Sequence, residues 1–64
     1  MKVKFSPGAS RLRVVKVLKE ELHLHLEEAK EMMEAGEFEC SDFEYPQLKK
    51  KLEEAGAGEF RRTD

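Results

Sequence analysis

Polar and apolar residues alternate at the start of the chain and then recur at helical spacing. Residues 2–5 read Lys-Val-Lys-Phe, which is the period of a half-buried strand. Pro7 and Gly8 end this pattern, because proline lacks an amide donor and glycine favours a turn. The apolar positions that follow repeat every three or four residues. They predict an amphipathic helix over residues 11–22, with Ser10 as its N-cap.

The two faces of this first helix differ in composition. At about 100° per residue, one arc that would face a core is apolar and contains Val14, Val15, Val17, Leu18 and Leu22. The opposite face carries Leu12 beside Lys16 and Lys19. A solvated helix face is normally polar throughout, so a leucine among cations is a weak indication of a contact surface.

A second helix is predicted over residues 26–35, with Gly36 as its C-terminal stop. Its inner residues recur at helical spacing: Leu26, Ala29, Met32 and Met33. The joint before it is short, and His25 is its expected N-cap, with Glu28 placed to accept a hydrogen bond from the cap's amide. His23 stands where helices often end in a left-handed residue, so we predict a positive φ there.

The remainder of the chain predicts a strand, a helix and a strand. Phe38 and Cys40 alternate with glutamates over residues 37–40, which indicates a short strand. The helix after it has two possible starts. Ser41-x-x-Glu44 forms a capping box, but it would place Pro46 where the helix needs an amide, so we favour Pro46 as the first helical residue.

The stripe of this third helix and the end of the chain complete the pattern. Leu48, Leu52 and Ala55 would face inward, Gly56 would end the helix, and residues 59–61 would form the last strand. The order β-α-α-β-α-β predicts an α+β fold. We expect a single domain over residues 1–64, a two-layer sandwich of three helices on a small three-stranded antiparallel sheet.

Charge is distributed unevenly along the chain. Residues 1–19 carry six bases and no acid, whereas residues 20–64 carry six bases and all fourteen acids. Such asymmetry suggests a face that attracts an anionic partner, although two solvated faces that neutralise each other explain it equally well. Nucleic-acid binding is less favoured, because the sequence pI is about 5.7 and the bases lack aromatic stacking positions among them.

The sequence contains no pattern typical of catalysis. No serine or cysteine is paired by spacing with a base, and the glycines do not form a phosphate loop, so we expect no enzyme activity, no catalytic residue and no cofactor. His23 and His25 diverge by about 200° on a helix, and metal sites need three or four convergent ligands, so no metal site is expected. The absence of a long apolar run predicts a soluble, cytoplasmic chain that does not bind membranes.

Two segments between Arg11 and Ala57 resemble the C-terminal domain of the bacterial ribosomal stalk protein. The first contains Val14-Val15-Lys16, Leu24, Leu26 and Glu28-Ala29-Lys30, and the second runs from Leu48 to Ala57. The resemblance implies the same β-α-α-β-α-β fold and a role in translation. It implies a mobile, non-catalytic head of the ribosomal stalk that recruits translational GTPases through its first helix and the start of its second. The family's protein-binding positions fall on Leu12, Val14, Val15, Lys16, Lys19 and Lys30.

The chain departs from this family at several positions. His23 and His25 replace the two glycines of the joint, and Arg13 replaces a small residue within the contact helix. The family's N-terminal dimerisation region and hinge have no counterpart in these residues. The chain is also similar to the adaptor of the bacterial Clp protease, which has the same fold, but that adaptor's substrate-pocket motif is missing. The alternative is therefore a free-standing adaptor that binds an unrelated protein.

Overall fold

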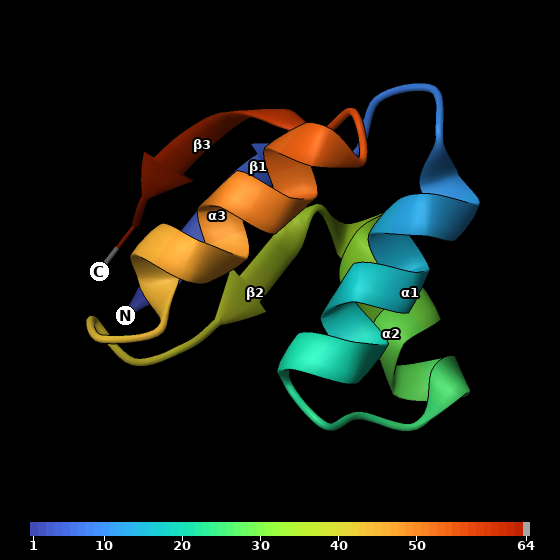
Figure 1. Ribbon diagram of the computed structural model, residues 1–64, viewed down its shortest axis with the longest axis horizontal. Coiled ribbons are helices and arrows are strands. Elements are labelled where there is room, and N and C mark those ends of the chain that lie inside the picture. The colour runs from blue at the N-terminus through green and yellow to red at the C-terminus, as the bar shows by residue number, and fades with distance from the viewer. Residues whose placement is uncertain (64) are drawn as a thin grey trace.

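The computed structural model describes residues 1–63 and contains three helices and three strands. In chain order these are β1 (Lys2–Ser6), α1 (Arg11–Glu21), α2 (Leu26–Ala35), β2 (Glu37–Glu39), α3 (Tyr45–Glu54) and β3 (Gly58–Arg62). Figure 1 shows α1 and α2 as a helical hairpin beside α3 and the sheet. The α+β class and the β-α-α-β-α-β order predicted from the sequence are confirmed.

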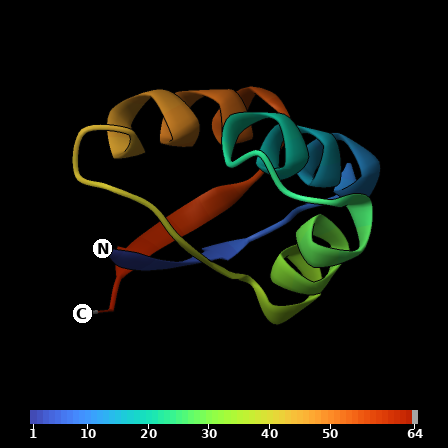
Figure 2. The ribbon, with the colours of Figure 1, turned by 90° about the horizontal axis from the view of Figure 1, so that it is seen from below.

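The three strands form one antiparallel sheet in the order β2-β1-β3. Central β1 alternates as predicted, with Val3 and Phe5 buried and Lys2 and Lys4 exposed. Figure 2 shows α3 lying along one face of the sheet, while the start of β1 lies beside the end of β3. The alternation of β1 therefore presents its apolar side to a core and its lysines to solvent.

The core draws apolar side chains from every helix and strand except β3. Its buried residues are Val3, Phe5, Val14, Val15, Leu18, Ala29, Met33, Phe38, Cys40, Leu48, Leu52, Ala55 and Ala57. Phe5 and Phe38 from neighbouring strands pack with ring centroids 5.4 Å apart. The inner stripes predicted for the first and third helices, including Leu18 and Leu52, supply most of its helical part.

The joint between α1 and α2 has the predicted backbone geometry. His23 has φ 54°, and the amide of Leu24 donates a hydrogen bond to the carbonyl of Lys19 at 3.0 Å. This is the 6→1 hydrogen bond of a Schellman motif, and it satisfies a carbonyl at the C-terminal end of α1. The amide of His25 then donates to Oε1 of Glu28 at 3.3 Å, so the predicted capping glutamate is confirmed. The joint therefore fixes the angle at which α2 leaves α1.

The start of α3 combines the two alternatives that the sequence offered. The amide and Oγ of Ser41 both donate to Oε1 of Glu44, at 3.3 and 3.0 Å, and the Glu44 amide donates back to Oγ at 3.1 Å. These bonds close a turn, and the helix begins after it at Tyr45. The predicted start at Pro46 is therefore wrong by one residue. Pro46 is tolerated at the second position because amides of the first helical turn need no helical acceptor.

Two local features differ from the expectations. Ser10 occupies the N-cap position of α1, but its side chain makes no capping hydrogen bond; its carbonyl accepts from Arg13 and Val14. In β3 the register with β1 shifts between Lys4 and Ser6, because β3 contains one extra residue there. Glu59 lies in this bulge with φ 56°.

Candidate protein-binding groove

An open groove of about 420 Å³ lies between the outer face of α1 and the start of α2. Its lining residues are Leu12, Val15, Lys16, Lys19, Glu20, Leu26 and Lys30. We refer to it as the α1–α2 groove. The structure thus brings together five of the six protein-binding positions that the resemblance implied. Lys30 lies on α2 and the other four lie on α1, so both helices contribute to the groove.

The centre of the α1–α2 groove is apolar. Leu12 is 82% exposed and Leu26 is 48% exposed, while Val15 is buried beneath them as part of the floor. Burying a whole leucine side chain contributes about 1.5–3 kcal/mol. These two residues are two of the three large hydrophobic residues that the described chain exposes, so the groove concentrates apolar surface that a partner can cover.

The rim of the groove is cationic. Lys16, Lys19 and Lys30 are exposed, and Glu20 is the one acid in the lining. Within residues 1–63, none of these three ammonium groups forms an ion pair with a carboxylate. Their charges are therefore available to an anionic partner.

Val14 is the one predicted contact residue that lies elsewhere. Its side chain is fully buried with Leu18 in the core, because both lie on the inner face of α1, and this helix packs against α2 and α3. Any effect of Val14 on binding would act through packing. Arg13, which replaces a small residue of the family, lines a separate hollow with Lys51 and Glu54 and does not line the groove.

Leu26 was expected in the core and is instead part of the groove. It is the first residue of α2, directly after the joint, and its side chain lies beside Leu12 and Lys30. The core position of α2 is filled one turn later by Ala29, which is fully buried. The apolar stripe of α2 therefore continues past the core and onto the surface.

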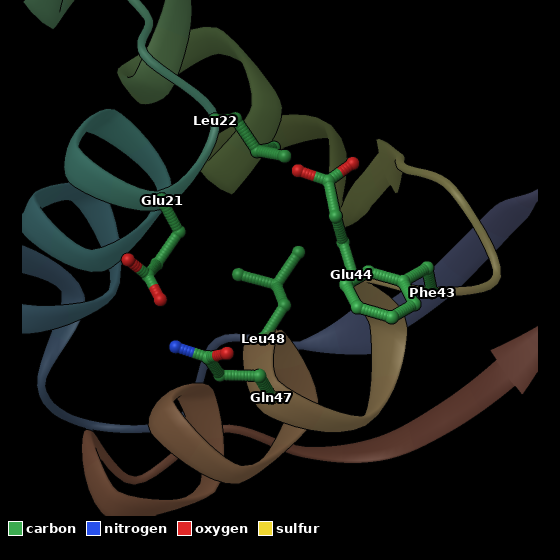
Figure 3. Close-up of a pocket in the computed structure, with 6 residues that line it drawn as sticks. All are labelled: Glu21, Leu22, Phe43, Glu44, Gln47 and Leu48. Atoms are coloured by element: carbon green, nitrogen blue, oxygen red, sulfur yellow. The ribbon is translucent and has the colours of Figure 1, made fainter.

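A second, smaller hollow of about 160 Å³ lies at the C-terminal end of α1, between that helix and the start of α3. It is lined by Glu21, Leu22, Phe43, Glu44, Gln47 and Leu48 (Figure 3). The leucines point into the hollow, and Glu21 beside it pairs with Lys51, Oε1 to Nζ, at 2.9 Å. Phe43 is 95% exposed. No sequence pattern singled out this phenylalanine, because turn residues have no period.

Other reactive groups do not assemble into a site. His23 and His25 are exposed on the joint, and no three potential ligands come together anywhere in residues 1–63. Burial raises the pKa of the Cys40 thiol above its ordinary value, which disfavours the reactive thiolate. No helix in the described part of the chain combines the length and apolar character needed to cross a membrane.

Comparison with curated proteins finds relatives of one kind. The chain is 44% identical over 55 residues to the large ribosomal subunit protein bL12 of Roseobacter denitrificans, a match that covers 81% of the chain and 45% of that protein. It is 43% identical over 56 residues to bL12 of Aquifex aeolicus and of Aquifex pyrophilus, covering 81% of the chain and 44% of each. The chain thus spans less than half the length of these relatives. No family profile and no solved structure matches it.

Proposed function

Because the chain is a homologue of the ribosomal stalk protein bL12, we propose that it acts as a protein-binding module through the α1–α2 groove. The proposed partner is an acidic surface of a translational GTPase that carries an apolar anchor. The role is recruitment rather than catalysis, and we place it in the cytoplasm, where ribosomes work. The alternative is an adaptor that uses the same groove for another acidic protein.

The observation that carries the proposal is the composition of the groove. Exposed leucines occupy its centre, and around them stand lysines that pair with no carboxylate of residues 1–63. Well-packed apolar anchors usually contribute most of the affinity of an interface, while exposed charge pairs contribute about 0–1 kcal/mol each. We therefore expect Leu12 and Leu26 to hold the partner, and the lysines to speed its encounter and set its orientation.

The charge of the rim provides the direct test. Replacing Lys16 and Lys19 with glutamate (K16E/K19E) should weaken binding to purified bacterial translational GTPases at least about tenfold, since attraction becomes repulsion. Calorimetric titration measures the dissociation constant. Binding of the unchanged chain should also weaken as salt rises, because the lysines are exposed and screened by ions.

A matched double reversal controls for net charge. Lys49 and Lys50 lie on α3, away from the groove, and Lys50 precedes Glu54 by four residues as Lys16 precedes Glu20. K49E/K50E changes the net charge equally and should leave the dissociation constant unchanged. Circular dichroism should show that both variants keep the helical content of the parent chain. Equal binding by K16E/K19E and the parent chain would rule out the groove as the contact surface.

A further inference from the structure

The turn before α3 displays an aromatic side chain among acids. Residues 41–44, which we name the Phe43 turn, read Ser-Asp-Phe-Glu, and Glu39 lies just before them. Phe43 is 95% exposed, and the acids around it are exposed as well. No base occurs between residues 31 and 48. The turn therefore presents an apolar anchor on an anionic segment.

Hydrogen bonds hold the Phe43 turn in place. Ser41 and Glu44 exchange three bonds between 3.0 and 3.3 Å, and the amides of Glu44 and Tyr45 each donate to the Ser41 carbonyl at 3.1 Å. The amide of Cys40, just before the turn, donates to the carbonyl of Met1 at 3.0 Å, which ties the start of the turn to the residue before β1. A side chain displayed on an ordered turn loses little further backbone entropy when it docks.

The Phe43 turn and the α1–α2 groove are complementary in charge and polarity. The groove offers exposed leucines inside a ring of lysines, and the turn offers an exposed phenyl ring between carboxylates. The groove volume of about 420 Å³ lies within the range of about 300–1,000 Å³ typical of clefts that bind small molecules. We propose that the Phe43 turn of one copy of this chain docks in the α1–α2 groove of a second copy.

The contact must be between copies. The Phe43 turn borders the hollow formed with Glu21 and Leu22, whereas the groove uses Leu12, Lys16 and other residues on a different face of α1. A single chain cannot bring its own Phe43 turn into its own α1–α2 groove without unfolding α1. Each copy has one turn and one groove, so association is either a reciprocal pair or a head-to-tail chain.

This inference rests on the proposed function in one respect: it assigns an acidic, apolar occupant to the same groove. Self-association would cover the groove and compete with an external partner. Binding of the partner should therefore weaken when the chain is concentrated or held close to other copies. Charge attraction and the apolar anchor are the same forces in both contacts.

A mixing experiment tests the contact. Analytical ultracentrifugation of the parent chain should show reversible association that increases with concentration. F43A lacks the anchor, and K16E/K19E reverses the charge of two of the three rim lysines, so each variant alone should associate at least about tenfold more weakly. A mixture of the two should recover association as one-to-one heterodimers, because F43A supplies the groove and K16E/K19E supplies the turn. Q47A, a change beside Phe43 in the hollow, should associate like the parent chain.

The same variants separate this inference from the proposed function. F43A keeps the groove and loses the competing self-contact, so it should bind a translational GTPase at least as tightly as the parent chain does. If the mixture recovers association but no GTPase binds the parent chain, the proposed function fails and the inference stands. Association of F43A at the parent's strength, a mixture that stays monomeric, or a parent chain that stays monomeric at all concentrations would each overturn the inference.

Discussion

The inner and outer faces of α1 carry similar aliphatic side chains in opposite surroundings. Val14 and Leu18 on the inner face are fully buried in the core, where α1 packs against α2 and α3, while Leu12 on the outer face is 82% exposed. The inner face supplies stability, because removing a buried side chain leaves a cavity that neighbours fill incompletely. The outer face leaves its leucine unburied within the domain. One helix thus separates residues for folding from residues that remain available for contact.

The largest expected effect comes from the inner face. Leu18→Ala should lower the free energy of unfolding by about 2–5 kcal/mol, because Leu18 is fully buried and its removal leaves a cavity in the core. A domain of this size has a total stability of about 3–10 kcal/mol, so this loss is a large fraction of the total. Urea denaturation followed by circular dichroism measures the change. A loss below about 1 kcal/mol would mean that the inner face of α1 is loosely packed.

The outer face should respond in the opposite way. Leu12→Ala should change the free energy of unfolding by no more than about 0.5 kcal/mol, since an exposed side chain has little packing to lose. The same change should weaken binding to the proposed GTPase partner at least about tenfold, because an anchor is removed. Calorimetric titration and urea denaturation of one preparation test both parts. A marked loss of stability with unchanged binding would reverse the assignment of the two faces.

The joint that sets the angle between the two helices should give the smallest effect. His23→Gly should leave the free energy of unfolding unchanged or raise it by up to about 1 kcal/mol, because glycine adopts φ 54° without the steric cost that histidine bears. His25→Gly is the matched control. His25 has φ −74°, so glycine there relieves nothing and should be neutral or slightly destabilising. A thermal melt of both variants distinguishes these outcomes. A clear loss of stability in His23→Gly would show that His23 bears no steric strain in this backbone conformation.

Much of the fold follows from local patterns in the sequence. The bounds of α2 match the prediction at both ends because His25 and Gly36 act through their own backbones and near neighbours. The bulge at Glu59 was not predicted, because it depends on the register with β1, more than fifty residues away in the chain. The predicted start of α3 was one residue too late, because the turn at Ser41 and the proline at Pro46 together determine where the helix begins.

The groove was predictable only in part. Leu12, Lys16 and Lys19 lie on one face of a single helix, so helical spacing alone groups them. Lys30 entered through the resemblance to the stalk protein, because its position relative to α1 depends on how the hairpin closes. Leu26 was missed for the same reason: periodicity places it on a face of α2, but the crossing of the two helices decides what that face meets.

The bulge in β3 has a consequence for how crowded copies of the domain behave. A long, flat edge strand offers a template on which other chains can extend the sheet toward amyloid. Here one edge strand is β3, which is bent by its extra residue at Glu59, and the other is β2, which is only three residues long. Neither edge strand is a good template. Encounters between molecules are thereby steered away from backbone polymerisation and toward reversible contacts of side chains.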